Sequence, residues 1–185
     1  MIDRRAVLKA GMGLGIGLHL ASGTVAAQED RAALRPQEGD LLIKSGDAAR
    51  NPLTPADIPL AAVQTMAWAM DPADRTVRSG SRLNQIVVIR FDPATLSAET
   101  RSRAADGVVA YTSICTHTGC DVDDYLAAEQ QLSCPCHFSI FDPKDGGKVV
   151  DGPAPRMLPA LPLTIVDGKL VVAKPFTAPI SFEKG

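Results

Sequence analysis

Apolar residues occur in short runs along this chain, and most of the runs have the length of β-strands. The segments 41–44, 62–70, 86–91 and 108–112 predict strands, and the run at 86–91 is apolar on both faces, as in a buried strand. A β-hairpin is expected from 162 to 173, because Asp167-Gly168 offers a two-residue turn between two apolar runs. The pattern is that of a chain built mainly from short strands.

One helix is expected between the strands at 86–91 and 108–112. Asp92 is a suitable N-cap, Pro93 suits the first helical position, and the polar segment 94–105 predicts a surface helix that Gly107 ends. The segment 51–59, which contains three prolines, predicts a loop with one helical turn. Short strands, frequent turns and a single helix together predict an all-β domain, roughly a sandwich.

Composition limits the class of protein. A chain of 185 residues that is 45% hydrophobic, with a net charge of −2, is long enough for one domain with its own core. Aromatic residues make up only 4% of it. With no basic face or interleaved aromatic stripe, nucleic acid is not an expected partner.

The N-terminal segment 1–27 has the features of an export signal. Arg4 and Arg5 precede an uncharged, glycine-rich run, and small residues follow up to Ala27. The arginine pair resembles a twin-arginine signal. We expect cleavage after Ala27 or, alternatively, retention of the segment as an N-terminal membrane anchor. Residues 28–40 are then a linker or lead-in to a domain at 41–185, located in the periplasm or on the periplasmic side of the bacterial inner membrane.

All four cysteines and two of the three histidines lie in two short clusters, which contain Cys115, His117 and Cys120, and Cys134, Cys136 and His137. Thiolates and imidazoles bind soft or borderline metals such as iron and zinc. Two facing loops that each give one thiolate and one imidazole therefore predict a metal site, with Cys115 and His117 paired with Cys134 and His137. The remaining cysteines, Cys120 and Cys136, are expected to form a disulfide in an exported protein. A structural zinc site, or two disulfides beside ordinary surface histidines, are the alternatives.

The two clusters resemble the loops of Rieske iron–sulfur proteins, Cys-x-His-x-Gly-Cys and Cys-x-Cys-His-x-Ser. The match extends from Cys115 to Phe141, and Gly152-Pro153-Ala154-Pro155 is similar to the proline loop that covers the cluster in cytochrome bc complexes. The resemblance implies a [2Fe–2S] cluster. It also implies a base of antiparallel sheets into which a small cluster-binding subdomain, at about 112–155, is inserted.

Residue roles follow from the same resemblance. Cys115 and Cys134 correspond to the ligands of the inner iron, His117 and His137 correspond to those of the outer iron, and Cys120 and Cys136 correspond to the disulfide. Ser139 matches a serine that donates a hydroxyl to a bridging sulfide. Phe141 stands where high-potential relatives have a tyrosine, which predicts a lower reduction potential than in relatives that have both hydroxyls.

The resemblance implies electron transfer within a larger enzyme. A Rieske oxygenase needs a second iron site with two histidines, and only His19, inside the signal, is left over. We expect the iron–sulfur subunit of a quinol–cytochrome c reductase-like complex, with a redox partner subunit, a cytochrome-type acceptor and quinol as the donor. The alternative is the small electron-transfer subunit of a periplasmic oxidoreductase of the arsenite oxidase type, where a phenylalanine, here Phe138, likewise follows the histidine. Thr118, in place of the leucine usual in the quinol-oxidising enzymes, disfavours the first assignment.

Overall fold

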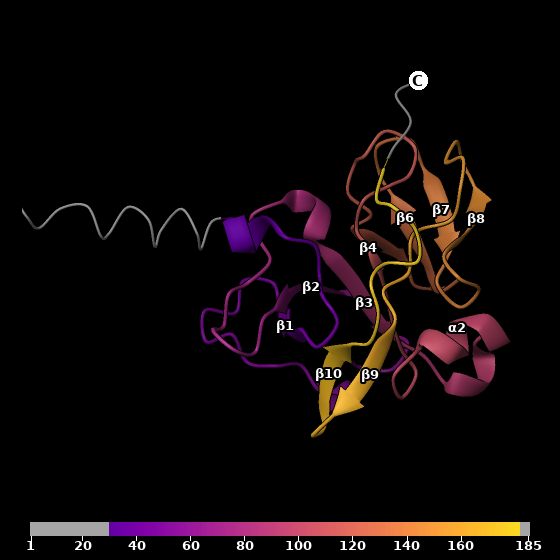
Figure 1. Cartoon of the computed structure of the whole chain (residues 1–185). Coiled ribbons are helices and arrows are strands. Elements are labelled where there is room, and N and C mark those ends of the chain that lie inside the picture. The colour runs from indigo at the N-terminus through magenta and orange to yellow at the C-terminus, as the bar shows by residue number, and fades with distance from the viewer. Residues whose placement is uncertain (1–29, 182–185) are drawn as a thin grey trace, which may run out of the picture.

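The computed structural model describes residues 30–181, which form two antiparallel sheets (Figure 1). The larger, base sheet has the order β4-β3-β2-β1-β10-β9. Its strands are β1 (Leu41–Lys44), β2 (Thr65–Met70), β3 (Ile86–Arg90), β4 (Val108–Thr112), β9 (Leu163–Val166) and β10 (Lys169–Val172). All of its paired neighbours are antiparallel.

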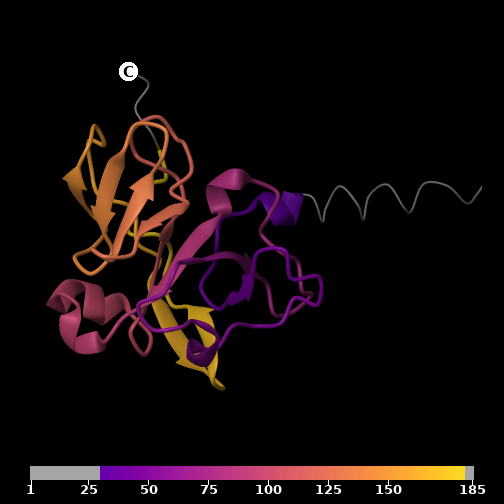
Figure 2. The ribbon, with the colours of Figure 1, turned by 180° about the vertical axis from the view of Figure 1, so that it is seen from behind.

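The smaller sheet is inserted in the chain between β4 and β9. It has the order β5-β6-β7-β8, and its strands are β5 (Asp124–Leu126), β6 (Gln131–Cys134), β7 (Ser139–Asp142) and β8 (Lys148–Asp151). Seen from either side, it lies at the opposite end of the molecule from the β9–β10 hairpin (Figures 1 and 2). The all-β fold class, with a base and an inserted subdomain, is confirmed.

The strands predicted from apolar runs are present, with one change of boundary. The run expected from residue 62 becomes β2 only at Thr65. Ala61 adopts a left-handed backbone conformation with φ of 51°, and its amide donates to the carbonyl of Arg90. Residues 62–64, which follow this turn, pair with neither sheet, so the strand begins later than its apolar character suggests.

The single helix expected at 94–105 is wrong in its extent. The structure has a 3₁₀ turn, η3 (Pro93–Thr95), and then a short helix, α2 (Ala98–Arg103). Between them Leu96 is extended and buried, and the Ser97 amide donates to a carbonyl of the β7–β8 turn. Burial of Leu96 and this contact with a distant turn interrupt the helix. Two further 3₁₀ turns are η1 (Pro55–Asp57), in the loop expected at 51–59, and η2 (Arg82–Asn84).

Strand β3 separates the two hydrophobic cores. Ile86 and Val88 face the core of the base, whereas Val87 and Ile89 face a second core that is shared with the small sheet. The prediction that this strand is buried on both faces is confirmed. The second core also contains Cys115, so the base supports the loops that carry the cysteines.

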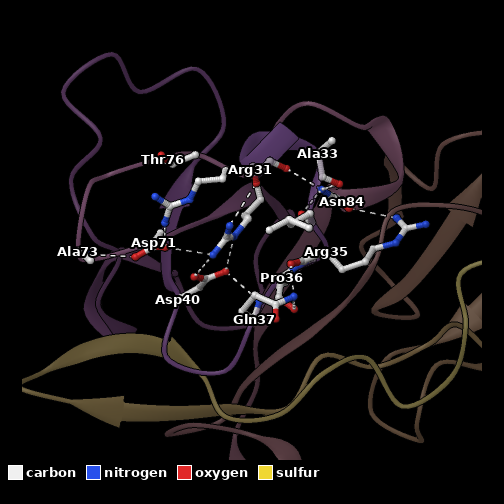
Figure 3. A network of polar contacts seen from close by, with 12 residues as sticks. Arg31, Ala33, Arg35, Pro36, Gln37, Asp40, Asp71, Ala73, Thr76 and Asn84 are labelled. Carbon is white, nitrogen blue, oxygen red and sulfur yellow. Dashed lines mark hydrogen bonds and ion pairs between the residues drawn. The ribbon is translucent and has the colours of Figure 1, made fainter. Parts of the chain in front are cut away.

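The segment 30–40 is bound to the base by a buried ion pair (Figure 3). Arg78 donates to both carboxylate oxygens of Asp40, at 2.9 and 3.0 Å, and both side chains are less than 5% exposed. The side-chain amide of Asn84 donates to the carbonyl of Leu34 at 2.7 Å. A Cβ on Gly80 would lie 2.8 Å from the backbone nitrogen of Ala33, so this glycine permits the close approach.

The expected signal or anchor at 1–27 lies outside the described residues. Within residues 30–181 there is no helix of the length and hydrophobicity needed to cross a membrane.

Candidate metal centre

The first cysteine loop follows β4 and is closed by its own backbone. The amide of Cys115 donates to the carbonyl of Cys120 at 2.8 Å, and the amide of Gly119 donates to the carbonyl of Cys115 at 3.1 Å. Gly119 has φ of 81°, which a glycine adopts without steric cost. The loop buries the Cys115 side chain and leaves His117 half-buried.

The second loop joins β6 to β7. Cys134 pairs with Ser139 across this hairpin, and the amide of Phe138 donates to the carbonyl of Cys134 at 3.0 Å. Cys134 is buried, whereas His137 is exposed. Each loop therefore presents its cysteine to the interior and its histidine toward the surface.

A disulfide joins the two loops, between Cys120 and Cys136. Cys115 and Cys134 are the free cysteines, and both are buried. The sulfur atoms of Cys120, Cys134 and Cys136 lie within 4.8 Å of one another. Because two of these three sulfurs are bonded to each other, that trio is not a ligand set. Cys134 and Cys115 are the thiols left to bind a metal.

The predicted ligands approach one another in two pairs, one of imidazoles and one of thiols. The rings of His117 and His137 are 4.7 Å apart between centroids and nearly perpendicular, at 85°. Burial, together with the neighbouring thiol of Cys115, raises the pKa of Cys134 to about 11, although the amides of Cys136 and His137 act in the opposite direction. In the absence of a cation the low-dielectric surroundings thus favour the neutral thiol.

Two buried polar atoms beside this site have no hydrogen-bond partner in the described part of the chain, His117 Nδ1 and Ser139 Oγ. Unpaired buried polar atoms are costly and call for an explanation such as a bound ion. Nδ1 offers a lone pair to a metal, and Oγ offers a proton to an anionic sulfur. These two atoms, two buried thiols and a second imidazole form a donor set that fits a [2Fe–2S] cluster.

Phe141 lies in the core beneath the loops. Its side chain is fully buried on β7, in the core shared by Cys115, Cys134 and Leu132. A hydroxyl is therefore missing at this position, as the sequence predicts. The hydroxyl of Tyr111 does not replace it, because it donates to the carbonyl of Pro143 at 2.8 Å. Burial raises the pKa of Tyr111 well above its usual range.

The expected proline loop lies against the second cysteine loop. A Cβ on Gly152 would be 2.5 Å from Cα of Ser139 and 2.6 Å from the carbonyl oxygen of Phe138. Any larger residue would clash here. Gly152 also has φ of 85°, a conformation that glycine adopts without steric cost. Of the two residues that follow, Pro153 is exposed and Ala154 is buried.

Sequence reasoning missed three residues that hold the loops in place. Thr116 is buried between two predicted ligands, and its hydroxyl donates to the carbonyl of Arg156 at 2.6 Å. Arg82 on η2 donates to the carbonyl of Gly119 and pairs with Asp121, both at 2.8 Å. The partners in these hydrogen bonds are 37 to 40 residues apart in the sequence, so no local spacing of residues indicates them.

A family profile for the Rieske [2Fe-2S] domain matches residues 68–162. The cytochrome bc1 complex Rieske iron-sulfur subunit of Streptomyces lividans is 32% identical over 149 residues, which cover 77% of this chain and 85% of that protein. A protein of Haloferax mediterranei, whose assigned name is that of a respiratory nitrate reductase Rieske subunit, is 45% identical over 75 residues, covering 40% of this chain and 33% of that one. The solved cyanobacterial plasma membrane Rieske protein of Synechocystis is 25% identical, with a TM-score of 0.41, and covers 64% of this chain and 93% of its own.

The chain belongs to the Rieske [2Fe–2S] family. Its cofactor is a [2Fe–2S] cluster, and its role is electron transfer. Some relatives are much longer, and the chain spans 41% of the Rieske subunit of Streptomyces coelicolor.

Proposed function

We propose that Cys115 and Cys134 hold the inner iron of the cluster and that His117 and His137 hold the outer iron. The burial of both thiols and the greater exposure of both imidazoles support this assignment. The unpaired Nδ1 of His117 is the observation on which it rests most directly. When bound, a cluster with two histidine ligands supplies one-electron chemistry at a potential of about −150 to +300 mV.

The chain's own residues control access to that centre. The disulfide and the proline loop hold the two cysteine loops together and keep the thiols out of water. His137 is exposed, so its imidazole can be reached by solvent or by a bound donor. This access from the histidine side suits a quinol as the donor.

We propose further that the chain is the iron–sulfur subunit of a quinol–cytochrome c reductase-like complex on the periplasmic side of the inner membrane. The match to a bc1 Rieske subunit over most of both chains supports this. The Gly152–Pro155 loop, seated on the second cysteine loop, agrees with it. A twin-arginine signal or anchor at 1–27 would deliver the folded domain to that side.

The direct test is to isolate the full-length chain, with a C-terminal tag, from membranes of its native host. The expected result is a complex that contains cytochrome b, shows a Rieske electron paramagnetic resonance signal on reduction, and reduces a c-type cytochrome with quinol. Isolation with a molybdenum-containing subunit, without quinol turnover, would instead establish the second candidate, a small subunit of a periplasmic oxidoreductase. Phe138 after the second histidine, and the short but closer match to the Haloferax protein, favour that candidate.

The ligand assignment has its own test. We expect His137→Ala to abolish the Rieske resonance signal, because one ligand of the outer iron is lost. Thr118→Val is the matched control, since Thr118 is exposed on the first cysteine loop and is not a proposed ligand. A His137→Ala protein that kept an unchanged spectrum would show the assignment to be wrong.

A further inference from the structure

Phe138 combines two unfavourable features at the outer end of the site. Its backbone is left-handed, with φ of 58°, a conformation that bulky side chains rarely adopt. Its side chain is 72% exposed, which makes it the most exposed of the large apolar residues in the described chain. The ring therefore gains little from burial in the folded domain, although its backbone is strained. Strain of this kind, next to the exposed His137, points to a role outside folding.

The surface around Phe138 is formed by two loops in contact. The carbonyl oxygen of Phe138 approaches Gly152 so closely that a Cβ there would be 2.6 Å away. Asp151 and Pro153, on either side of this glycine, are exposed, and so is Pro135 in the second cysteine loop. Phe138 therefore stands on a surface with further apolar side chains and a carboxylate nearby.

The charge around this surface is mainly negative. The segments 113–123, 134–138 and 151–155 contain no lysine or arginine. Asp124, Ser133, Ile140 and Asp151 pair in turn across the small sheet, which places two exposed carboxylates at its opposite edges, one residue along from the Cys134–Ser139 pair. The guanidinium of Arg82, which donates to the carbonyl of Gly119 on the first cysteine loop, is paired with Asp121, and that of Arg156 is held by the carbonyls of Pro179 and Ser181.

The negative charge of this surface favours some binding partners and disfavours others. A second copy of the chain would bring carboxylates against carboxylates, and an anionic lipid surface would be repelled in the same way. A protein with cationic side chains around an apolar contact would be attracted and would place its own redox centre near His137. Large exposed aromatic residues are the typical anchors of such contacts.

We propose that Phe138, with the exposed carboxylates of Asp124 and Asp151 around it, is the docking surface for a redox partner protein whose contact face has an apolar centre ringed by lysine and arginine. The inference rests on the proposed electron-transfer function. It adds the chemistry of the partner and the residue that anchors it.

The test measures electron transfer from the reduced protein, carrying its cluster, to two oxidants by stopped flow. One is a c-type cytochrome whose exposed haem edge is ringed by lysines, and its ferric haem accepts one electron from the reduced centre. The other is ferricyanide, a small anion that also accepts one electron and needs no apolar contact. The expected rate constant for the cytochrome falls as ionic strength rises, whereas that for ferricyanide rises, because the surface charge attracts the first and repels the second.

Phe138→Asn separates docking from folding, because asparagine tolerates a left-handed backbone and removes the apolar ring. We expect the rate with the cytochrome to fall about tenfold, the ferricyanide rate to stay within about twofold, and the unfolding temperature not to fall. The matched control is Val166→Thr, at a half-exposed apolar residue of the β9–β10 hairpin, which should change neither rate. The double variant Asp124→Asn/Asp151→Asn should slow the cytochrome reaction at low salt and leave it unchanged at high salt.

Each contrary outcome overturns the inference in a recognisable way. A Phe138→Asn protein that reduced the cytochrome at the original rate would show that Phe138 is not the anchor. A rate constant with the cytochrome that rose with ionic strength would show that the surface does not favour a cationic partner. Dimers that dissociated on this substitution would identify a second copy as the occupant instead. Loss of the resonance signal from the unmodified protein would contradict the proposed function itself, whereas an intact signal with unchanged rates would contradict the docking surface alone.

Discussion

The hydroxyl of Thr116 donates a 2.6 Å hydrogen bond to the backbone carbonyl of Arg156. This contact ties the first cysteine loop to the chain that follows the proline loop. The guanidinium of Arg156 in turn binds the carbonyls of Pro179 and Ser181, so the C-terminal segment holds the same junction from outside. Three segments far apart in sequence thus fix the position of the first cysteine loop.

Replacing Thr116 with valine should loosen that loop. Thr116→Val keeps the shape of the side chain but leaves the carbonyl of Arg156 without its donor in a buried place, at a cost of about 1–3 kcal/mol. We expect a lower free energy of unfolding and faster loss of the cluster under chelator, measured by denaturation and by the decay of visible absorbance. Thr118→Val on the same loop, where the side chain is exposed, should have little effect. Equal cluster decay in the two variants would show that the hydrogen bond does not hold the site.

The Cys120–Cys136 disulfide should stabilise the fold by closing a short loop of chain. The cysteines are 16 residues apart, and a cross-link that closes a loop of this length stabilises a fold by about 3 kcal/mol. The double variant Cys120→Ser/Cys136→Ser should therefore have a lower free energy of unfolding and lose its cluster more readily. Reducing agent should reproduce both effects in the unmodified protein and add nothing to the double variant. A double variant as stable as the unmodified protein would contradict this role.

Phe141→Tyr should raise the reduction potential. Phe141 lies in the same core as Cys115 and Cys134, and a new hydroxyl that bonds a cysteine sulfur stabilises the more negative, reduced state. A hydrogen bond that differs by about 1 kcal/mol between the two redox states corresponds to about 40 mV for one electron. Protein-film voltammetry would measure the shift. Phe91→Tyr, in the same core, is the control, and an unchanged potential in Phe141→Tyr would refute the assignment of this position.

Asp40→Asn should destabilise the whole domain. It leaves the buried guanidinium of Arg78 without its bidentate partner, and breaking a buried ion pair in this way costs about 3–5 kcal/mol. The hydrogen-bonded carboxylate of Asp40 raises the pKa of Arg78 above its ordinary value. Because that ordinary value already lies far above neutral pH, the charge of Arg78 persists when the partner is removed. Chemical denaturation would measure the loss. The exposed pair Arg103–Glu99 is the control, and Glu99→Gln should cost less than about 1 kcal/mol.

Acid should weaken the turn at η1. Hydrogen bonds from the hydroxyl and the amide of Thr54 hold the pKa of Asp57 below its usual value. A carboxyl whose pKa is lower in the folded state stabilises the fold above its unfolded pKa, about 3.9, and loses that contribution as the pH falls through the folded value. Asp57→Asn should therefore be less stable than the unmodified protein at pH 7, with a difference that shrinks below about pH 4. A difference that stayed constant down to the lowest pH would contradict this.

Local patterns were sufficient for the strands of the base and for the family. Residues 41–44, 86–90 and 108–112 are strands because their apolar side chains need burial on a sheet, and that need is visible in a short window. The cysteine and histidine loops were identified because ligand spacing is a local property. The four strands of the small sheet, β5 to β8, were not predicted, since they are three or four residues long and their pairing depends on the loops between them. The interruption at Leu96 was missed for a similar reason, because it depends on a contact with a distant turn.

The buried pair between Asp40 and Arg78 also limits how the protein can move. Residues 31–40 are held to the base by side chains of the 78–84 segment, so they turn with the domain as one body. This segment is therefore part of the rigid body and cannot serve as a flexible tether for it.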